Sequence, residues 1–349
     1  MSIFDIDPDI ARASTLSAEF YTDERYFAES RDKIFARSWQ LAARASEVDN
    51  LAPATVLESF LDEPVLFARE NESLHCLANV CTHRGKLLVE ENCRAGGIRC
   101  GYHGRRFALD GRFLSMPEFD GVQDFPSEAD NLPKIPAAAL GDLLFVSVAP
   151  RASFEEVFAP VVERLAWVDW SSLKFSAARS RDYFVDAHWA LYCENYLEGF
   201  HIPFVHQSLN AVVDYDSYTT ETFRFASLQT GRAKSGDDAF DFDESVAALY
   251  FFVFPNLMLN FYPWGLSVNV VKPLRKDLTK VSYLTYVADE SKLDRGAGAD
   301  LGRVEYEDQR VVEAVQKGIN SRFYDRGRYS PSREQGTHHF HRLIAEFMK

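Results

Sequence analysis

The spacing of apolar residues changes along the chain and separates an N-terminal segment from the rest of the chain. Within residues 18–39, apolar side chains recur at helical spacing, with acidic residues near the start and basic residues near the end. This order of charges complements the dipole of a helix. We therefore expect one amphipathic helix here, in an N-terminal segment over residues 1–40 that packs on the C-terminal part of the chain.

From Thr55 to about Ala149 the pattern changes to short runs of strand-forming residues bounded by turn residues. Such runs predict β-strands. They are TVLESF (55–60), PVLFARE (64–70), SLHCLANV (73–80), GGIRC (96–100), RRFAL (105–109) and RFLSM (112–116). Asp110-Gly111, between the last two, favours a hairpin turn. We therefore expect a small all-β domain over residues 41–150.

Longer apolar runs dominate the C-terminal part of the chain. Ser153 and Glu156 have the spacing of a capping box and predict the start of a helix. The runs LYFFVFPNLMLNFYPW (249–264), GLSVNVV (265–271) and KVSYLTYVA (280–288) predict adjacent strands of an antiparallel sheet; 231–244 predicts a loop or lid, and 303–318 a long helix ending at Gly318. The fold class expected is α+β, with a second domain over residues 151–349.

Composition limits the class of protein. The chain has 349 residues, 46% of them apolar, and a formal net charge of −14. An acidic surface repels nucleic acid and anionic membranes, so neither is expected as a partner. The acidic N-terminus predicts no signal peptide, and no apolar run is long enough to span a bilayer. Five cysteines, an odd number, suit a reducing cytoplasm better than a disulfide scaffold.

Two cysteine and histidine pairs form the first candidate site. Cys81 and His83 stand on one glycine-containing loop, and Cys100 and His103 stand on another. Such a set can hold one tetrahedral zinc or a Rieske [2Fe–2S] cluster. Zinc fingers usually pair cysteine with cysteine and histidine with histidine, whereas each loop here supplies one of each. The arrangement favours a two-iron cluster, with both cysteines on one iron and both histidines on the other.

A second histidine pair surrounds a proline. His201 and His206 are five residues apart, which in a straight helix would point them in different directions. Pro203, between them, breaks a helix and can bring both imidazoles to one point. Glu198 lies one turn before the first histidine. This pattern indicates a second metal site.

A facial triad for non-heme iron requires one carboxylate besides two histidines. Asp308 falls within the apolar stripe that Val304, Val311, Val312 and Val315 form on the predicted helix over 303–318. A buried carboxylate needs a metal or a cationic partner, and an ordinary salt bridge to an arginine is the alternative. Two other acids of this segment, Glu305 and Glu307, point to other faces of the helix. We expect them to be solvated.

The segments CTHRGKLL, CGYHGRRF and ALDGRF resemble the Rieske domain in the large subunit of the Rieske non-heme iron oxygenases. The family usually has proline before Tyr-His and tryptophan after the following glycine, and this chain has Gly101 and Arg105 there. Those departures spare all four cluster ligands. They affect the packing of the second loop and the potential of the cluster.

The segment Asn195-Tyr-Leu-Glu198-Gly-Phe-His201-Ile-Pro-Phe-Val-His206 resembles the mononuclear-iron motif of the same family. The resemblance implies His201 and His206 as iron ligands and Asp308 as the third. It also implies catalytic roles for Asn195 and Glu198, the latter linking the two metal centres between neighbouring subunits. The tail GRYSPSREQGTHHFHRLIAEF is similar to the branch with choline, carnitine and betaine oxygenases.

The resemblance, which runs from about Phe20 to the end of the chain, implies an architecture and a reaction. The fold would combine a Rieske domain with a helix-grip (Bet v1-like, START-like) catalytic domain that has an antiparallel sheet and a long C-terminal helix. A homotrimer would take electrons from a separate flavin or iron–sulfur reductase, because no Gly-X-Gly-X-X-Gly fingerprint for NAD(P)H or flavin is present. It would use O2 at the mononuclear iron.

The substrate stays open at this point. A quaternary ammonium compound would need an aromatic cage, for which tyrosines and four tryptophans, Trp167, Trp170, Trp189 and Trp264, are available. Hydroxylation next to nitrogen would then cause N-demethylation. One alternative is an aromatic-ring-hydroxylating dioxygenase alpha subunit. The other is a Rieske electron carrier without chemistry of its own, which would leave the second site unexplained.

Overall fold

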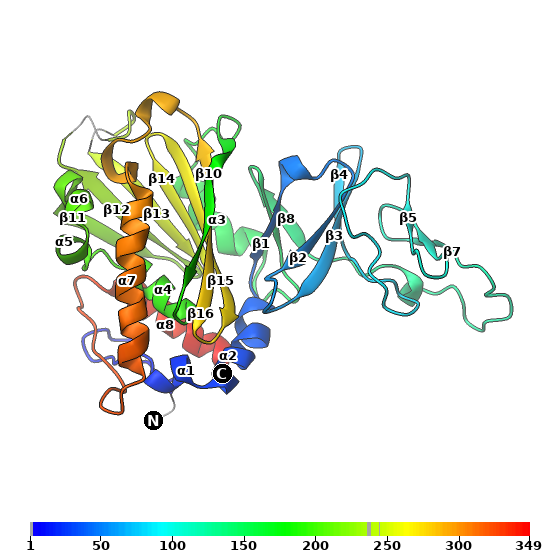
Figure 1. Cartoon of the computed structure of the whole chain (residues 1–349), viewed down its shortest axis with the longest axis horizontal. Coiled ribbons are helices and arrows are strands. Elements are labelled where there is room, and N and C mark those ends of the chain that lie inside the picture. Colours follow the sequence, from blue (N-terminus) through cyan, green and yellow to red (C-terminus); the bar gives the residue numbers. More distant parts are fainter. Residues whose placement is uncertain (1–2, 236–238, 244) are drawn as a thin grey trace. The chain divides into compact units, whose positions relative to one another are not determined.

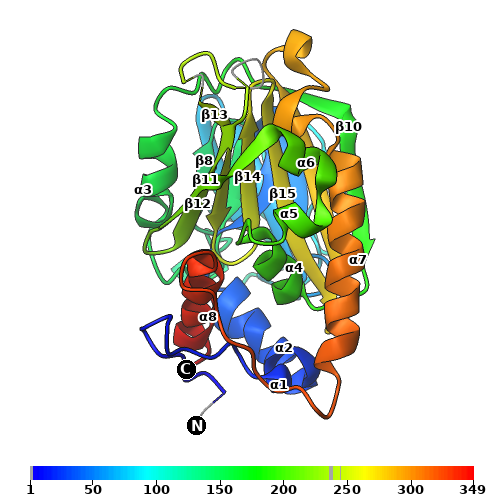
Figure 2. The ribbon, with the colours of Figure 1, turned by 90° about the vertical axis from the view of Figure 1, so that its left-hand side faces the viewer.

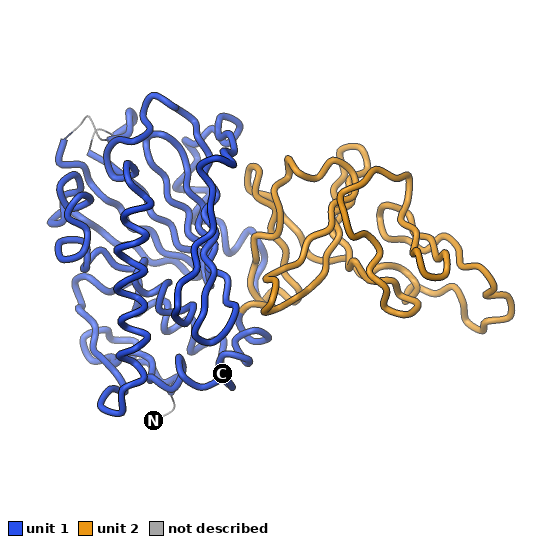
Figure 3. Tube along the Cα trace, viewed as in Figure 1, with its two compact units in different colours: residues 1–34, 152–349 blue, residues 35–151 orange. Residues whose placement is uncertain are grey.

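The computed structural model describes residues 3–235, 239–243 and 245–349. The chain divides into two compact units, one formed by Met1–Ile34 with Ala152–Lys349 and the other by Phe35–Arg151 (Figure 3). The N-terminal segment therefore belongs to the same unit as the C-terminal part of the chain. Each unit is built around its own antiparallel sheets, which agrees with the α+β class expected from the sequence.

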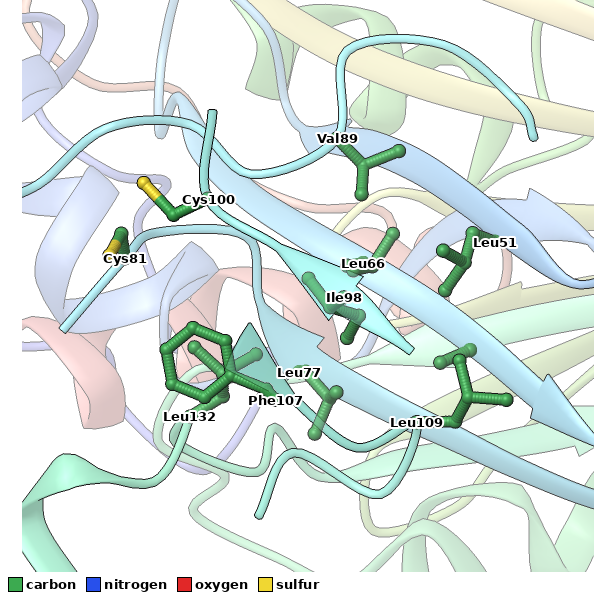
Figure 4. Packing of buried hydrophobic residues seen from close by; sticks show 11 residues of the cluster. Leu51, Leu66, Leu77, Cys81, Val89, Ile98, Cys100, Phe107, Leu109 and Leu132 are labelled. Atoms are coloured by element: carbon green, nitrogen blue, oxygen red, sulfur yellow. The ribbon is translucent and has the colours of Figure 1, made fainter. Parts of the chain in front are cut away.

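The smaller unit consists of three small antiparallel sheets, ordered β1-β9-β8, β2-β3-β4 and β5-β6-β7 (Figure 1). Its elements are β1 (Gln40–Arg44), η2 (Ala45–Glu47), β2 (Leu51–Val56), β3 (Glu63–Glu70), β4 (Ser73–Ala78), β5 (Ile98–Arg99), β6 (Arg106–Phe107), β7 (Phe113–Ser115), η3 (Glu128–Asp130), β8 (Ala137–Leu140) and β9 (Leu143–Val146). Leu66 and Phe107 belong to its central apolar cluster, which also contains Cys81 and Cys100 (Figure 4).

The predicted strand over 55–60 is wrong in its second half. β2 ends at Val56, and Leu57 and Ser59 have positive φ angles of 48° and 67°. The left-handed backbone turns the chain there and cannot continue a strand. Strands β1, β8 and β9 were not predicted from the sequence, whereas β3 and β4 match the predicted runs closely.

Among the described residues of the larger unit, seven strands form one antiparallel sheet in the order β10-β16-β15-β14-β13-β12-β11. The strands are β10 (Lys174–Val185), β11 (Val213–Thr222), β12 (Ala226–Ala233), β13 (Val246–Val253), β14 (Leu257–Tyr262), β15 (Gly265–Arg275) and β16 (Leu278–Val287). Nearly every residue of β13, β14 and β15 is buried, because both faces of these central strands are covered. The antiparallel sheet predicted from the long apolar runs is therefore confirmed.

Helices α4 to α7 lie on one face of this sheet (Figure 2). The helical elements are α1 (Ala18–Thr22), α2 (Glu24–Ser30), the π-helical turn η1 (Arg31–Phe35), α3 (Phe154–Arg164), α4 (Trp189–Tyr196), α5 (Ile202–Val205), α6 (Gln207–Val212), η5 (Glu290–Lys292), η6 (Gly296–Gly298), α7 (Leu301–Ile319) and α8 (Gln335–Met348). Ser153 caps α3 by accepting a hydrogen bond from the Glu156 N–H, as its position predicted.

The single helix predicted over 18–39 is wrong. Asp23 separates α1 from α2: its backbone is extended, and its side chain accepts a hydrogen bond from the Arg25 N–H. A capping aspartate thus starts a second helix in the middle of the periodic segment. The loop predicted over 231–244 also begins too early, since residues 231–233 belong to β12. Positions 236–238 and 244 of that prediction lie outside the described residues.

No helix in the described part of the chain combines the length and the apolar character that crossing a bilayer requires.

Candidate metal centres and the adjoining cavity

Two loops of the smaller unit repeat one backbone arrangement around the predicted cluster ligands. The Gly85 N–H donates to the Cys81 carbonyl at 3.0 Å, and the Gly104 N–H donates to the Cys100 carbonyl at 3.1 Å. Both glycines have left-handed φ angles, 73° and 77°. A side chain at either position would strain this backbone, so the glycines permit the tight loops that present the ligands.

The four donors lie together at the tips of these loops. Cys81 and Cys100 are buried at the edge of the apolar cluster (Figure 4), and the rings of His83 and His103 have centroids 4.9 Å apart. His103 Nδ1 is buried and has no hydrogen-bond partner among the described residues. A buried ring nitrogen without a partner is costly unless it binds a metal. The donor set therefore fits a [2Fe–2S] cluster with two thiolate and two imidazole ligands.

Arg105, one of the departures from the family pattern, is buried and links the two loops. Its guanidinium lies 4.8 Å from the centroid of the Phe113 ring and forms an ion pair of 2.5 Å with Asp130 Oδ1. The Asp130 carbonyl also accepts a hydrogen bond of 2.9 Å from Thr82 Oγ1 in the first loop. Arg105 thus packs against aromatic rings, and its charge is compensated.

The second group lies in the larger unit and brings together residues far apart in the sequence. The ligand atoms of His201, His206 and Asp308 all lie within 4.8 Å of one another. His206 Nε2 is 3.1 Å from His201 Nε2 and 3.0 Å from Asp308 Oδ1. The short helix α5, with Pro203 in its first turn, separates the two histidines, which confirms that the chain bends between them.

Each of these three side chains is oriented by another polar residue. Glu198 Oε1 lies 2.7 Å from His201 Nδ1, and Asn195 Nδ2 donates to Asp308 Oδ1 at 2.6 Å. On the other histidine, Glu307 Oε2 lies 2.8 Å from His206 Nδ1. Carboxylates on the outer nitrogen of a histidine are the usual support of a metal ligand, because they fix its tautomer and ring orientation.

The prediction that Glu305 and Glu307 are solvated is wrong. Glu307 faces His206: burial alone would raise the pKa of Glu307, but hydrogen bonds with His206 and Arg303 lower it. Glu305 is only 1% exposed, and Tyr192 donates to its Oε2 at 2.5 Å. Both acids therefore contact polar side chains at or near the cavity, Tyr192 for Glu305 and His206 for Glu307, and are not solvated.

The predicted apolar stripe of α7 is also wrong at Val315, which is exposed. The buried positions are Glu305, Val312, Gln316 and Ile319, which follow helical spacing as a single stripe. A search for apolar residues alone misses this stripe because half of its members are polar. Admitting buried polar residues into the pattern would have revealed it.

A cavity opens beside the second group; its empty space, including the open solvent at its mouth, is about 750 Å³. Its described lining includes His201, His206 and Asp308. The remaining described lining residues are Tyr192, Asn195, Tyr196, Glu198, Ile202, Leu209, Tyr218, Gln229, Tyr250, Asn260, Tyr262, Ser267, Asn269, Tyr283, Ala297, Leu301 and Val304. Six of them are tyrosines, four carry a side-chain amide, and none is a lysine or an arginine.

Of the aromatic residues that the sequence offered for a cage, tyrosines line the described part of the cavity and tryptophans do not. No tryptophan is among the described lining residues. Trp264 stacks on Tyr262 from behind, with ring centroids 5.2 Å apart, and Trp189 is buried elsewhere in the core. Burial raises the pKa of the cavity tyrosines, Tyr218 and Tyr250 among them, so these phenols stay neutral. The wall is therefore built of neutral tyrosine rings.

Two protein families match the two parts of the chain. Residues 38–126 match the Rieske [2Fe-2S] domain, and residues 172–349 match the catalytic domain of the ring hydroxylating alpha subunit. Among individual relatives, the chain is 31% identical to choline monooxygenase, chloroplastic, of Arabidopsis thaliana, over 99% of this chain and 86% of that protein. It is also 31% identical to the carnitine monooxygenase oxygenase subunit of Escherichia coli (strain K12), with 97% and 94% covered.

Solved structures of Rieske oxygenases also superpose on this chain. The quaternary ammonium Rieske monooxygenase CntA in complex with L-carnitine superposes with a TM-score of 0.77 at 26% identity, and 99% of each chain is covered. Naphthalene 1,2-dioxygenase from Rhodococcus sp. superposes with a TM-score of 0.75 at 18% identity, covering 96% of this chain and 94% of that one. The second likeness concerns the fold alone.

Proposed function

The chain belongs to the Rieske-type ring-hydroxylating oxygenase family, and we propose that it oxidises a small quaternary ammonium compound. Members of this family are oxidoreductases that carry a Rieske [2Fe–2S] cluster and a mononuclear iron. They act with O2 on a small-molecule substrate and receive electrons from a separate reductase. The electron carrier without chemistry is excluded, because the chain has the catalytic domain as well as the Rieske domain.

We assign the cluster to the four donors of the smaller unit, with Cys81 and Cys100 on one iron and His83 and His103 on the other. The buried, unpartnered His103 Nδ1 supports this assignment. We assign the mononuclear iron to His201, His206 and Asp308, whose ligand atoms all lie within 4.8 Å of one another.

Two histidines and one carboxylate leave coordination positions open, so that bound iron supplies the reaction with dioxygen. The chain's own residues prepare this site. Glu198 and Glu307 hold the outer nitrogens of His201 and His206. Asn195 directs the amide hydrogen of its side chain to Asp308 and thereby orients the carboxylate. These contacts orient the three ligands toward one point, where a metal would bind.

The observation that carries the substrate class is the lining of the cavity, with six tyrosines and no lysine or arginine among its described residues. Aromatic faces attract a quaternary ammonium group, and a basic side chain would repel it. In such a substrate, one oxygen atom enters a C–H bond next to nitrogen. The other oxygen leaves as water, with two electrons from the reductase and two protons. The hydroxylated ammonium ion then breaks its C–N bond and releases an aldehyde, a tertiary amine and a proton.

Hydroxylation of an aromatic ring is the alternative within the family. An arene offers no hydrogen-bonding group to the four side-chain amides of the cavity wall, and it lacks the positive charge that tyrosine faces attract. Turnover with a surrogate reductase separates the two substrate classes. We expect product from choline or a betaine and none from naphthalene or indole. The reverse result would contradict the proposed substrate class.

A homotrimer is proposed on the basis of Glu198. One of its oxygens already contacts His201, and in a ring of subunits the carboxylate would also accept a hydrogen bond from His103 of the partner subunit. Glu198→Gln should then keep both metal centres and lose substrate oxidation, which iron analysis and single-turnover kinetics would measure. Full activity in this variant would contradict the bridge.

A cytoplasmic location is proposed from the free cysteines alone.

A further inference from the structure

A carboxylate without a cationic partner is buried behind the cavity wall. Glu305, on the inner face of α7, is 1% exposed. Within the described residues, its Oε1 has no hydrogen-bond partner, and no lysine, arginine or histidine pairs with it. A buried carboxylate is costly when nothing compensates its charge. A positive charge brought close to Glu305 would therefore be stabilised.

Two tyrosines connect Glu305 with the cavity. Tyr192 of α4 donates its hydroxyl hydrogen to Glu305 Oε2 at 2.5 Å, and Tyr283 of β16 donates to the same oxygen. Both tyrosines also line the cavity. Because both hydroxyl groups donate to Glu305, their hydrogens are not available to a molecule in the cavity. Donation to a carboxylate polarises a phenol and increases the negative potential of its ring, which attracts a cation more strongly.

The two carboxylates in the cavity wall itself are already engaged. Glu198 contacts His201, and Asp308 contacts His206 and the Asn195 amide. Both belong to the candidate iron site. Glu305 lies one turn before Asp308 on α7 and is the acid near the cavity that neither a histidine nor a basic side chain compensates among the described residues.

The basic residues near the cavity also favour a substrate without a negative charge. The described cavity lining contains no lysine or arginine that could hold an anionic group of a substrate. Among the basic residues near this part of α7, Arg303 pairs with Glu307, and Arg181, which lies beside Gly302, is not among the lining residues of the cavity. The carboxylate tail of a substrate would thus add a negative charge to that of Glu305 and would have no basic side chain in the described lining to pair with. A substrate with a neutral tail would need no such partner.

The ionisation behaviour of Glu305 is consistent with this environment. Burial raises its pKa to about 7, although the hydroxyl groups of Tyr192 and Tyr283 oppose that rise. A cation in the cavity would favour the ionised form and strengthen both hydrogen bonds.

We propose that Glu305, acting through Tyr192 and Tyr283, is the counter-charge that makes the cavity select a quaternary ammonium group attached to an uncharged tail. This inference rests on the proposed function and deepens it. Glu305 is a positioning residue, since Tyr192 and Tyr283 line the cavity and Glu305 does not. We expect choline to bind more tightly than two other compounds. One is its neutral carbon isostere, 3,3-dimethylbutan-1-ol, and the other is the zwitterion L-carnitine.

The experiment measures binding of these three compounds to the iron-loaded protein by calorimetry. In Glu305→Gln, we expect the affinity for choline to fall about tenfold or more, and the affinity for 3,3-dimethylbutan-1-ol to change less than about twofold. Tyr283→Phe keeps the ring but removes one link to the carboxylate and should give a smaller loss for choline. Glu313→Gln, farther along α7, is the matched control and should change neither affinity.

Three results would overturn the inference. Equal loss of choline and of its neutral isostere would mean that Glu305 only maintains the shape of the cavity. Loss of iron from Glu305→Gln, measured by metal analysis, would assign the carboxylate to the iron site. Tighter binding of L-carnitine than of choline would contradict the uncharged tail. If the unchanged protein binds the isostere but neither ammonium compound, the proposed function itself fails, together with the inference built on it.

Discussion

Asn195 and Asp308 stand 113 positions apart in the sequence and are joined by a hydrogen bond of 2.6 Å from Asn195 Nδ2 to Asp308 Oδ1. The same carboxylate oxygen lies 3.0 Å from His206 Nε2. The amide therefore holds the carboxylate of α7 against the histidines that come after α4. Since Asp308 lies on α7 and both histidine ligands follow α4, this bond ties together the two parts of the candidate iron site.

Asp308→Ala should release the mononuclear iron and leave the Rieske cluster intact, because the four cluster donors belong to the other unit. We expect the iron content to fall from about three to about two per chain, with the visible absorption of the cluster unchanged. Substrate oxidation should be abolished. Asp277→Ala, at an exposed turn, serves as the control and should retain all iron. Full iron content in Asp308→Ala would refute its assignment as a ligand.

Asn195→Ala should weaken the site without emptying it. The carboxylate of Asp308 keeps its contact with His206 but loses the hydrogen bond that orients it. We expect a loss of about 10- to 100-fold in iron affinity or in kcat. Competition with a chelator and steady-state kinetics would measure the two effects. An unchanged iron affinity together with an unchanged kcat would show that the hydrogen bond has no role.

Glu307→Gln tests a residue that the sequence pattern had assigned to the solvent. A glutamine can still hydrogen-bond to His206 Nδ1, but it removes the negative charge that makes this imidazole a stronger ligand. We expect iron affinity to fall by about tenfold. Glu313→Gln, on the same helix, is the comparison. Equal iron affinity in the two variants would mean that Glu307 is an ordinary surface charge.

His188 should make the larger unit sensitive to acid. Burial, with a smaller effect of Lys276, lowers its pKa to about 3, so the folded protein keeps this imidazole neutral. The unfolded chain takes up a proton below pH 6.5. Stability is therefore lost as the pH falls, by up to about 1.4 kcal/mol per pH unit between about 6.5 and 3.

Replacement by asparagine separates this effect from the loss of packing. His188 Nδ1 caps α4 by accepting the Ala190 N–H, and asparagine can supply the same acceptor without a titrating group. Denaturant unfolding at several pH values should give a shallower acid slope for His188→Asn. Parallel curves for the two proteins would show that His188 titrates normally.

Two glycine replacements should have opposite effects on stability. A Cβ at Gly336, in the first turn of α8, would overlap the Leu197 carbonyl oxygen, whereas a Cβ at Gly318 in α7 meets nothing within 4 Å. We expect Gly336→Ala to destabilise by about 1–3 kcal/mol. Gly318→Ala should stabilise by about 0.5–1 kcal/mol, because alanine loses less entropy in a helix. Urea midpoints measure both changes, and stabilisation by Gly336→Ala would contradict the close approach of α8 to Leu197.

The ligand residues of both metal centres could be read from the sequence because their chemistry is local. Cysteine or histidine side chains stand a few residues apart on each loop, and Pro203 lies between His201 and His206. Strands such as β3 and β14 are equally local, since the period of apolar residues and the turns beside them suffice to predict them. Where a capping residue interrupted a regular pattern, as Asp23 does, the prediction failed.

The sequence by itself determined the two metal-binding motifs, the α+β class and the family. The tertiary structure alone decided which polar residues surround the iron site and the cavity. Glu307 meets His206 across 101 positions, and Glu305 meets Tyr192 across 113. Glu305 is buried because helix α7 packs there against Tyr192 and Tyr283, and Glu307 is half-buried against His206. A helical pattern in one segment contains no information on the chemistry of the surface that it will face, and so their roles could not be predicted.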